Sequence, residues 1–464
     1  MHYVIIGSGP CGLTVAYILS KLKKKVTIVE REESIGGCHQ VRRTYNNRFT
    51  EHGPRIYLDN YVNFIQILND MGIDFYELFT KSDESFSKSS KDMLKHVSPL
   101  ELLSLTYHYI CFMFDKDSYK KYTMYDIVSG FSNDAKRYID IQCKTTDGAG
   151  MKVYTVYEYF ELINQCVLYD LYEPKFSNDY VLFELIKKYL TNNKVKFIQN
   201  QNIQQIRDTN HILSDKGTLI YFDELIICTP LNHLVDILKS SRNLKNIFGH
   251  FDDIQRYSKY TDYLPYLSFT LHWNDYVTHQ FPTVIGEWKV FLKDISKKTK
   301  DPFSKTIYSG ALVELEIKSK TTHKTANQTD NHIDLLNEIY NQLNREIKFV
   351  KAPDEIILSP AVYRSYEQWK TVDTAFMFTK RSKPFPFTSV IRNIHSVGTH
   401  NLHSYIPFTS YESATQNAIS FCHHLLPESE TVIKIKDIRR LDSILVWFCF
   451  VFIFLLCVLV MCNV

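Results

Sequence analysis

A glycine-rich hexapeptide near the N-terminus is the first group of residues whose spacing indicates a chemistry. Residues 7–12 read Gly-Ser-Gly-Pro-Cys-Gly, directly after an apolar segment and before an amphipathic one. In such a strand–turn–helix unit the first glycine permits a tight turn, the second lets the backbone approach a pyrophosphate, and the third lets helix and strand pack closely. The positive end of the helix then faces the phosphates. This motif predicts a dinucleotide site that includes Gly7, Gly9, Pro10, Cys11 and Gly12.

Two further groups follow at spacings that extend this site. Glu30 closes the next apolar segment, 18 residues after Gly12, where a carboxylate binds ribose hydroxyls. Six residues beyond it begins the pair Gly36-Gly37. A plain NAD-binding domain does not need this pair, which suits a second backbone approach to a longer cofactor. Arg31 and Cys38, the neighbours of Glu30 and Gly37, complete the predicted binding set.

Together these segments, VIIGSGPCG and VTIVEREESIGGC, resemble the N-terminal fingerprint of the FAD-containing amine oxidase superfamily. That group includes monoamine oxidases, phytoene-type desaturases, protoporphyrinogen oxidase and, more distantly, UDP-galactopyranose mutase. The resemblance implies FAD as the cofactor. Most members carry an arginine after the glycine pair, whereas this chain has Cys38, so Arg42 or Arg43 is the candidate for the missing phosphate contact.

The resemblance continues in the middle of the chain. Residues 51–57, EHGPRIY, are similar to the segment that passes beside the flavin ring in the desaturases and the mutase. This implies cofactor contacts from Gly53, Pro54, Arg55 and Ile56, although a Gly-Pro turn could also be purely structural. Residues 195–207, followed by FDELIICTP, resemble a strand pair of the same superfamily. There the position of Ile203 contacts the adenine end through its backbone.

Residues 394–425 look like the closing flavin segment of the family, which is a strand, a Gly-Asp turn and a helix. Gly398 and the Glu-Ser-Ala at 412–414 fit that form, and Thr399 replaces the usual aspartate. The resemblance implies that backbone N–H groups near Ser410 and Tyr411 face the N1–C2 carbonyl region of the flavin. A helix N-terminus at this place stabilises the negative charge of reduced flavin.

These motifs predict an α/β fold with a discontinuous Rossmann-like FAD-binding domain, an α+β substrate domain and a C-terminal transmembrane helix. The FAD-binding domain is expected at residues 1–75, 195–238 and 394–428, the substrate domain at 76–194 and 239–393, and the transmembrane helix at 443–462. Polar stretches at 81–95 and 318–331 are expected to be loops. Residues 102–114 and 157–172 are expected to be helical, as is the segment carrying Leu335, Ile339 and Leu343.

The C-terminal prediction depends on an uninterrupted apolar run. Ile444–Cys462 contains nineteen apolar residues with no charge, Gly or Pro. A helix of this length, at about 1.5 Å per residue, approaches the roughly 30 Å of a bilayer core; a buried core helix is the alternative. The preceding basic residues, Lys434, Lys436, Arg439 and Arg440, predict a single-pass C-terminal anchor with the catalytic body facing the cytoplasm.

Composition excludes several other functions. The 54 Lys+Arg nearly balance the 51 Asp+Glu, so no nucleic-acid partner is predicted. Ten cysteines occur without a CxxC pair, so neither a metal site nor a disulfide framework is predicted. Metalloprotease, nucleophile-elbow and phosphate-loop motifs are absent from the sequence. The catalytic residues and the oligomeric state remain open.

The leading functional hypothesis is an FAD-dependent oxidoreductase that acts on a small-molecule substrate by hydride transfer to flavin. Two departures weigh against a simple monoamine oxidase. Ser410 occupies the place of an aromatic-cage tyrosine, for which Tyr405 or Phe408 could compensate, and residues 174–177 lack the expected glycine pair. The alternatives are a non-redox sugar-nucleotide mutase, favoured by Arg55, and a flavin-binding membrane protein without turnover.

Overall fold

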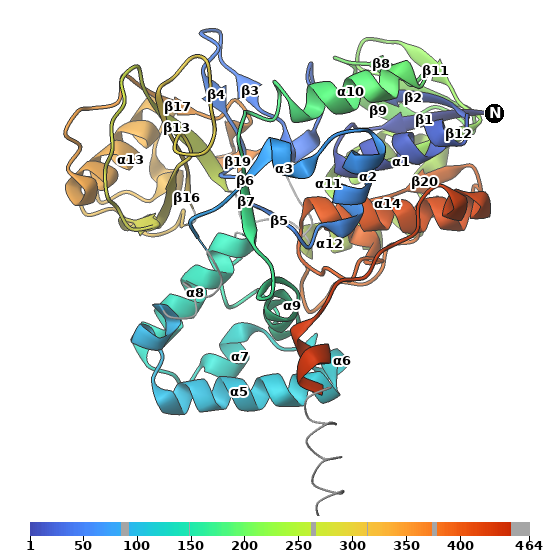
Figure 1. Cartoon of the computed structure of the whole chain (residues 1–464). Helices are drawn as coiled ribbons and strands as arrows, with labels where there is room; N and C mark the ends of the chain where they lie inside the picture. The colour runs from blue at the N-terminus through green and yellow to red at the C-terminus, as the bar shows by residue number, and fades with distance from the viewer. Residues whose placement is uncertain (85–91, 148, 261–265, 313, 374–377, 447–464) are drawn as a thin grey trace, which may run out of the picture.

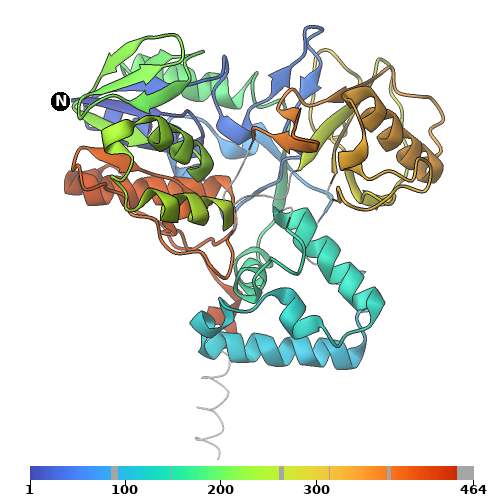
Figure 2. The same ribbon diagram turned by 180° about the vertical axis from the view of Figure 1, so that it is seen from behind.

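The computed structural model describes residues 1–84, 92–147, 149–260, 266–312, 314–373 and 378–446. Three regions are visible in Figure 1: a sheet flanked by helices near the N-terminus, a second sheet carrying one long helix, and a helical lobe below them. Figure 2 shows the same three regions from behind. Chain segments far apart in sequence meet in the first region, which contains the predicted dinucleotide motifs.

The first region is built on a five-stranded sheet in which every neighbouring pair is parallel. Its strands in spatial order are β20 (Ile394–Ser396), β12 (Glu224–Ile227), β1 (His2–Ile6), β2 (Lys25–Val29) and β8 (Lys196–Ile198). The glycine hexapeptide follows β1 and opens helix α1 (Pro10–Lys21). Since a parallel sheet is covered on both faces, the central residues of its strands are mostly apolar and buried. The α/β, Rossmann-like part of the predicted fold class is confirmed.

Alternate residues of β1 pack into two different cores. Tyr3 and Ile5 join helices α1, α2 (Val62–Asp70), α10 (Leu182–Asn192) and α14 (Tyr411–Leu425). Val4 and Ile6 join the small sheet and two helices on the other face. The elements of that second layer are β9 (Ile203–Ile206), β10 (His211–Ser214), β11 (Leu219–Tyr221), α11 (Leu231–Ser240) and α12 (Phe251–Tyr260). The period of two along the strand therefore fixes a three-layer arrangement.

The second region is an antiparallel sheet with α13 (His332–Ile347) packed on one face. Its strands in spatial order are β14 (Val284–Ile285), β15 (Val290–Asp294), β16 (Thr306–Leu312), β13 (Leu267–Trp273) and β17 (Glu355–Leu358). Trp273 and Trp288 are fully buried between the sheet and the helix. The expected helix with Leu335, Ile339 and Leu343 is α13, and these three side chains face the sheet.

Short strands connect the two regions. They are β3 (Arg42–Arg43) with β4 (Phe49–Thr50), β5 (Tyr57–Leu58) and β6 (Phe79–Lys81) on either side of β7 (Leu171–Pro174), and the hairpin β18 (Val362–Ser365) with β19 (Gln368–Thr371). Four-residue helix α3 (Phe75–Leu78) precedes β6. Residues 157–172, expected to be one helix, instead form α9 (Val156–Cys166) and then enter β7, because that strand pairs with β5 and β6.

The lower lobe of Figure 1 is helical. Besides α9 it contains α5 (Pro99–Phe114), α6 (Lys116–Tyr119), α7 (Met124–Val128) and α8 (Asn133–Asp147), which share one apolar core. The 3-10 turns are η1 (Gly37–His39), η2 (Arg242–Leu244), η3 (Ala326–Gln328), η4 (Thr399–Asn401) and η5 (Pro427–Thr431). Turn η3 lies within the expected loop at 318–331.

The predicted transmembrane helix at 443–462 is corrected by the structure. Within the part of the chain that the structure describes, no helix has the length and apolar character needed to cross a membrane. Most of the predicted span, residues 447–462, lies outside the described residues. An apolar run indicates avoidance of water, whereas a span also needs a continuous helix of about 20 residues. The single-pass anchor, the bilayer partner, the membrane localisation and the cytoplasm-facing orientation are therefore not retained.

Candidate functional site

A cavity of about 660 Å³ opens at the carboxyl ends of four strands of the parallel sheet. Its wall includes Gly7 after β1, Glu30 after β2, Thr229 after β12 and Gly398 after β20. Ligands of open α/β sheets bind at this edge, because the loops after the strands converge there. The cavity volume lies in the range of pockets that enclose organic ligands.

The glycine hexapeptide forms one end of the cavity. Gly7 has a φ of +98°, and its N–H donates to Val29 O at 2.8 Å. A Cβ on Gly12 would lie only 2.1 Å from Gly7 O, so strand β1 and helix α1 can approach this closely only with glycine. A Cβ on Gly9 would meet no backbone closer than Gly37 Cα at 3.8 Å. Gly9, Pro10 and Cys11 line the cavity, whereas Gly12 packs behind it.

The second glycine pair packs directly on the first loop. Gly36 N–H donates to Ser8 O at 3.0 Å, and a Cβ on Gly37 would lie 2.9 Å from Gly9 Cα. Gly37 has a φ of +58° and lines the cavity together with Cys38. The ring of Phe183 lies against Gly36, where an added Cβ would be 2.5 Å from Phe183 Cε2. The two glycine turns therefore pack together and form one continuous stretch of backbone along the cavity.

Glu30, which is predicted to bind ribose, also forms hydrogen bonds that hold the glycine loop. Its Oε2 accepts hydrogen bonds from the N–H of Ser8 at 2.8 Å and from the hydroxyl of Ser8 at 2.6 Å. Its Oε1 accepts from Glu32 N–H at 3.0 Å. The buried carboxylate thus fixes the glycine loop and still lines the cavity. Binding of ribose by Glu30 stays a prediction.

The arginines after the glycine pair do not supply the phosphate contact expected of them. Arg42 forms a two-pronged ion pair with Asp373, and Arg43 pairs with Asp179 and Asp301. Among the described residues that line the large cavity, neither Arg42 nor Arg43 occurs. Their guanidinium groups instead join distant segments.

Arg31 is the arginine that does line the cavity. Its Nη1 lies 3.0 Å from His233 Nε2, and its Nη2 donates to Val372 O at 3.3 Å. Burial and the charge of Arg31 lower the pKa of His233 to about 4, so this imidazole is neutral and can accept from the guanidinium. Arg31 is positioned at the cavity wall by these two partners and by an ion pair of its Nε with Glu32 Oε1 at 3.1 Å.

The closing segment lines the cavity beside the glycine loop, because Cys11 Sγ donates to Val397 O at 3.3 Å. Gly398, Thr399 and Ser410 line it, and Gly398 N–H donates to Asn401 Oδ1 at 2.7 Å. Helix α14 begins here, with the Ser410 hydroxyl accepting from Ser413 N–H at 2.9 Å. The positive end of a fifteen-residue helix is thus directed at this part of the cavity.

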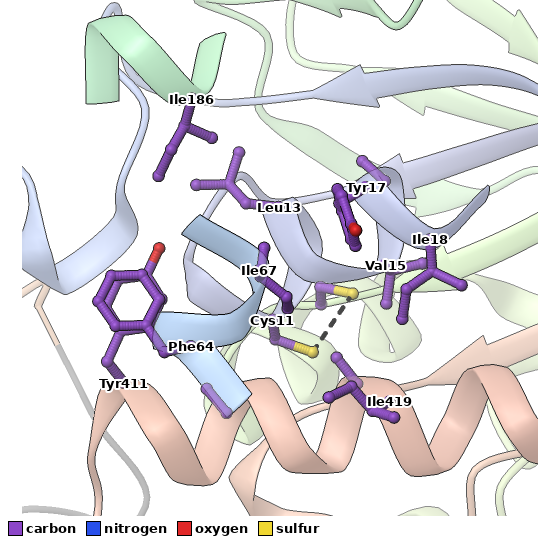
Figure 3. Close-up of a cluster of buried hydrophobic side chains, with 14 of the residues drawn as sticks. Cys11, Leu13, Val15, Tyr17, Ile18, Phe64, Ile67, Ile186, Tyr411 and Ile419 are labelled. Carbon is purple, nitrogen blue, oxygen red and sulfur yellow. Dashed lines mark hydrogen bonds between the residues drawn. The ribbon is translucent and has the colours of Figure 1, made fainter. Parts of the chain in front are cut away.

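Tyr411 lies beside this helix start, but its ring is turned into the protein core. Its ring centroid is 3.9 Å from that of Phe64, and both side chains are shown together in Figure 3. The next residue, Glu412, accepts hydrogen bonds from the N–H groups of Asn63 at 3.1 Å and Phe64 at 2.9 Å. Any flavin contact of Tyr411 would therefore come from its backbone, as the sequence predicts.

The two predicted segments around Ile203 and residues 53–56 lie at different places relative to the large cavity. Ile203 lines the large cavity at the start of β9, between Asn202 and Gln204. Among the described wall residues Gly53, Pro54, Arg55 and Ile56 do not occur. Gly53 is instead needed because a Cβ there would lie 2.7 Å from the ring of Tyr266. Arg55 donates to Cys38 O and lines a smaller cavity next to the large one.

The large cavity has the polar character that a dinucleotide requires. Three of its wall atoms are buried and have no hydrogen-bond partner within the described chain: His39 Nδ1, Gln201 Oε1 and Thr229 Oγ1. Buried polar atoms are normally satisfied, so these three indicate a polar ligand. Burial, with Arg55 and His52 contributing, lowers the pKa of His39 well below its usual value, so its ring is neutral.

The residues present therefore fit an FAD with its pyrophosphate at the glycine loops and its flavin near α14. The polar wall residues that were not predicted from the sequence include His39, Gln201, Thr229 and His233. Thr229 had a signal in the sequence, because Thr229-Pro230 ends the apolar run before α11. Gln201 lies within the recognised segment 195–207 and His39 directly follows Cys38, but neither motif selects these side chains.

Comparison with known proteins agrees with this geometry. The NAD(P)-binding Rossmann-like domain family matches residues 5–71. The solved structure of putrescine oxidase bound to putrescine has a TM-score of 0.60 at 11% identity, covering 92% of this chain and 99% of that one. The chain therefore has the fold of putrescine oxidase. Cyclohexylamine oxidase from Brevibacterium oxydans matches with a TM-score of 0.56 at 12% identity, over 91% of this chain and 99% of its own.

An oxidoreductase from Methanosarcina mazei also matches, with a TM-score of 0.56 and 11% identity over 90% of this chain and 99% of that chain. Comparison with curated proteins gives no match. The resemblance to the amine oxidase superfamily is thus confirmed at the level of the fold, and the chain carries a Rossmann-like dinucleotide-binding domain.

Proposed function

We propose that the protein is an FAD-dependent oxidoreductase of the amine oxidase type, which oxidises an organic substrate by hydride transfer to flavin. The observation that carries this proposal is one continuous cavity whose wall includes the glycine loop at the start of α1, the second glycine pair and the start of α14. A dinucleotide with phosphates in its middle and an electron-accepting ring at one end suits this arrangement.

Bound FAD would supply the hydride acceptor, and the chain would supply position and electrostatics. The start of α14, capped by Ser410, stabilises negative charge at the wall of the cavity. Glu412 fixes that helix start by accepting from two N–H groups of α2. The N-terminus of α14 therefore contributes positive potential to the cavity and is held in place by the hydrogen bonds of Glu412.

The substrate class is proposed from the structural neighbours, one of which is an oxidase bound to putrescine and another an oxidase of cyclohexylamine. An amine is accordingly the first candidate. The expected compensation by Tyr405 is not available in this conformation, because its hydroxyl lies 3.2 Å from Glu412 Oε1 and 3.4 Å from Asn60 O. Phe408 is buried in the apolar core. Aromatic recognition of the nitrogen would have to come from other side chains.

The mutase alternative depends on Arg55 as a diphosphate ligand. The Arg55 guanidinium donates a hydrogen bond to Cys38 O, and the cavity that Arg55 lines has a volume of about 10 Å³. That is room for about one water molecule and not for a sugar diphosphate. This geometry favours the oxidoreductase over the mutase.

Anaerobic mixing of the purified FAD-loaded protein with a panel of amines, alcohols and UDP-hexoses tests the proposal. We expect loss of the flavin absorption near about 450 nm with at least one amine or alcohol, because an oxidoreductase must reduce its flavin. Interconversion of UDP-hexoses by chemically reduced protein, without bleaching by any compound, would instead identify the mutase. Failure to bind FAD at all would remove both proposals.

A further inference from the structure

Helix α5 carries apolar side chains on two opposite faces. Toward the helical lobe it buries Leu105 and Phe112, and Leu102 and Tyr109 pack against the same core. The opposite face, called here the α5 seam, consists of five apolar side chains that are between 45% and 87% exposed: Leu100, Leu103, Tyr107, Ile110 and Phe114. Figures 1 and 2 show α5 along the lower edge of the lobe, away from both sheets. A surface helix normally has one apolar face, so the second one indicates a partner.

The spacing of the α5 seam is that of a coiled-coil contact. Its residues follow one another at intervals of 3, 4, 3 and 4 positions. This repeat is the pattern by which one α-helix packs against another at a crossing angle of about 20°. A helix face that covers a broad apolar surface has a wider stripe, whereas Ser104 and Thr106 flank this one with polar side chains. A second helix is therefore the partner that fits the α5 seam.

The α5 seam is complementary to itself. Tyr107 is at its centre, with Leu100 seven residues before it and Phe114 seven residues after it. When two copies of α5 cross in opposite directions about a two-fold axis at Tyr107, each Leu100 faces the partner's Phe114. Each Leu103 then faces the partner's Ile110. A smaller side chain therefore meets a larger one at both ends, and the positive end of each helix lies beside the negative end of the other.

The charges of α5 do not oppose this pairing. The helix contains one carboxylate, Glu101, and neither lysine nor arginine. Glu101 forms the capping box with Ser98 and also accepts a hydrogen bond from the N–H of Ser132, so its charge is held at the start of the helix. Like charges that face each other across an interface lower the affinity, and the α5 seam carries none.

The exposed area of the α5 seam is sufficient for a dimer. Since a large aromatic side chain contributes about 150–250 Å², the exposed parts of the five side chains amount to roughly 600 Å². The largest apolar patch of a typical monomeric protein measures about 300–600 Å². Two copies that cover this seam remove roughly 1,200 Å² from water, which is above the ~1,000 Å² that a specific interface needs.

We propose that the α5 seam is the contact surface of a homodimer, in which a second copy of this chain binds through its own α5 seam in the antiparallel direction. Among the described residues that line the large cavity, none belongs to α5. Dimerisation through the α5 seam therefore leaves the candidate site open in both copies. The inference is independent of the proposed oxidoreductase function, so each can fail without the other.

The first test is the molar mass of the full-length protein at several concentrations, measured by analytical ultracentrifugation. We expect a dimer that dissociates on dilution through about the micromolar range, because the interface is at the lower end of the size range. Leu103→Glu places a charge in the seam of each copy and should raise the dissociation constant by roughly 10²-fold or more. Leu219→Glu is the matched control, because Leu219 is also exposed but lies on β11. This control should dimerise as the wild type does, and both variants should keep the wild-type melting temperature.

The second test is oxidative cross-linking of substituted cysteines, in a Cys111→Ser background because Cys111 lies next to the seam. Tyr107→Cys should give a disulfide-linked dimer, since two copies of this position meet at the two-fold axis. Tyr276→Cys, at an exposed tyrosine in the loop after β13, is the control that should stay monomeric. Leu100→Cys mixed with Phe114→Cys should link the two variants to each other, because these positions lie about 20 Å apart along one helix. Links only between identical variants would overturn the antiparallel arrangement.

Other results would overturn the homodimer itself. A wild-type protein that stays monomeric up to about 100 µM has no interface of the proposed size. Self-association that Leu103→Glu does not weaken takes place through another surface. A monomer that binds phosphatidylcholine vesicles and loses this binding in Leu103→Glu uses the seam for lipid. A monomer in which the Tyr107→Cys thiol is protected from a maleimide has its seam covered by another part of the same chain.

Discussion

Two alanine substitutions in the same glycine loop should affect different properties: Gly12→Ala should lower stability, and Gly9→Ala should weaken cofactor binding. In Gly12→Ala the new Cβ would lie 2.1 Å from Gly7 O and 3.1 Å from Gly7 C, both backbone atoms. The overlap can be relieved only by moving α1 away from β1, which disturbs the core between them. Overpacking of this kind costs about 1–3 kcal/mol. We therefore expect a lower melting temperature for Gly12→Ala in cofactor-free protein.

In Gly9→Ala the nearest atom to the new Cβ is Gly37 Cα at 3.8 Å, an ordinary van der Waals contact. Gly9 has φ −70° and ψ 179° at the N-cap of α1, a conformation that alanine adopts without strain. The cofactor-free variant should therefore unfold within about 0.5 kcal/mol of the wild type. The methyl group would, however, stand where the pyrophosphate approaches the loop.

A clash of about 1–3 kcal/mol with the pyrophosphate corresponds to roughly 5- to 150-fold weaker FAD binding. The assays are thermal unfolding without cofactor and titration of the cofactor-free protein with FAD, followed by flavin fluorescence. Gly12→Ala with an unchanged melting temperature would refute the packing argument. Wild-type affinity in Gly9→Ala would show that the pyrophosphate does not lie on this loop.

Two further perturbations test the framework of the site. Glu412→Ala should destabilise the protein by about 2–4 kcal/mol in urea unfolding, because it leaves two N–H groups of α2 buried without an acceptor; exposed Glu428→Ala should change it by less than about 0.5 kcal/mol. The pKa of Asp442 is lowered to about 2: burial acts to raise it, but hydrogen bonds and ion pairs with Arg440 and Lys116 outweigh burial. The contribution of Asp442 to stability is therefore present above pH 4 and is lost as the pH falls through about 2. Asp442→Asn should therefore show a flatter decline in stability between pH 5 and 2, and an unchanged slope would exclude this ion pair as its source.

Much of the fold could be predicted from local pattern. The apolar segments around the glycine hexapeptide became β1 and α1, and the helix carrying Leu335 became α13. These elements follow from periodicities of 2 and 3.6 residues, which each segment carries by itself. The end of the segment 157–172 was predicted incorrectly, because the helix ends at Cys166 and residues 171–172 pair with β5 and β6. The C-terminal span was inferred from hydropathy alone, and no helix of the described chain has the required length and composition.

The sequence by itself determined where the backbone of the candidate site bends and approaches a ligand. Gly7, Gly12 and Gly37 occupy positions that only glycine fits, and that requirement depends on residues close to them or on a turn that recurs in many proteins. The strand order that brings Thr229 and Gly398 to the same cavity follows from the same alternation of strands and helices.

Only the tertiary structure decided which charges remain available. Arg42 and Arg43 look equally suited to a phosphate until Asp373 and Asp301, hundreds of residues away, are seen to neutralise them. Glu51 looks like an ordinary surface glutamate until the second sheet covers it and raises its pKa. Burial and ion pairing are properties of the residues that surround a group in space, and the spacing of residues along the chain does not encode them.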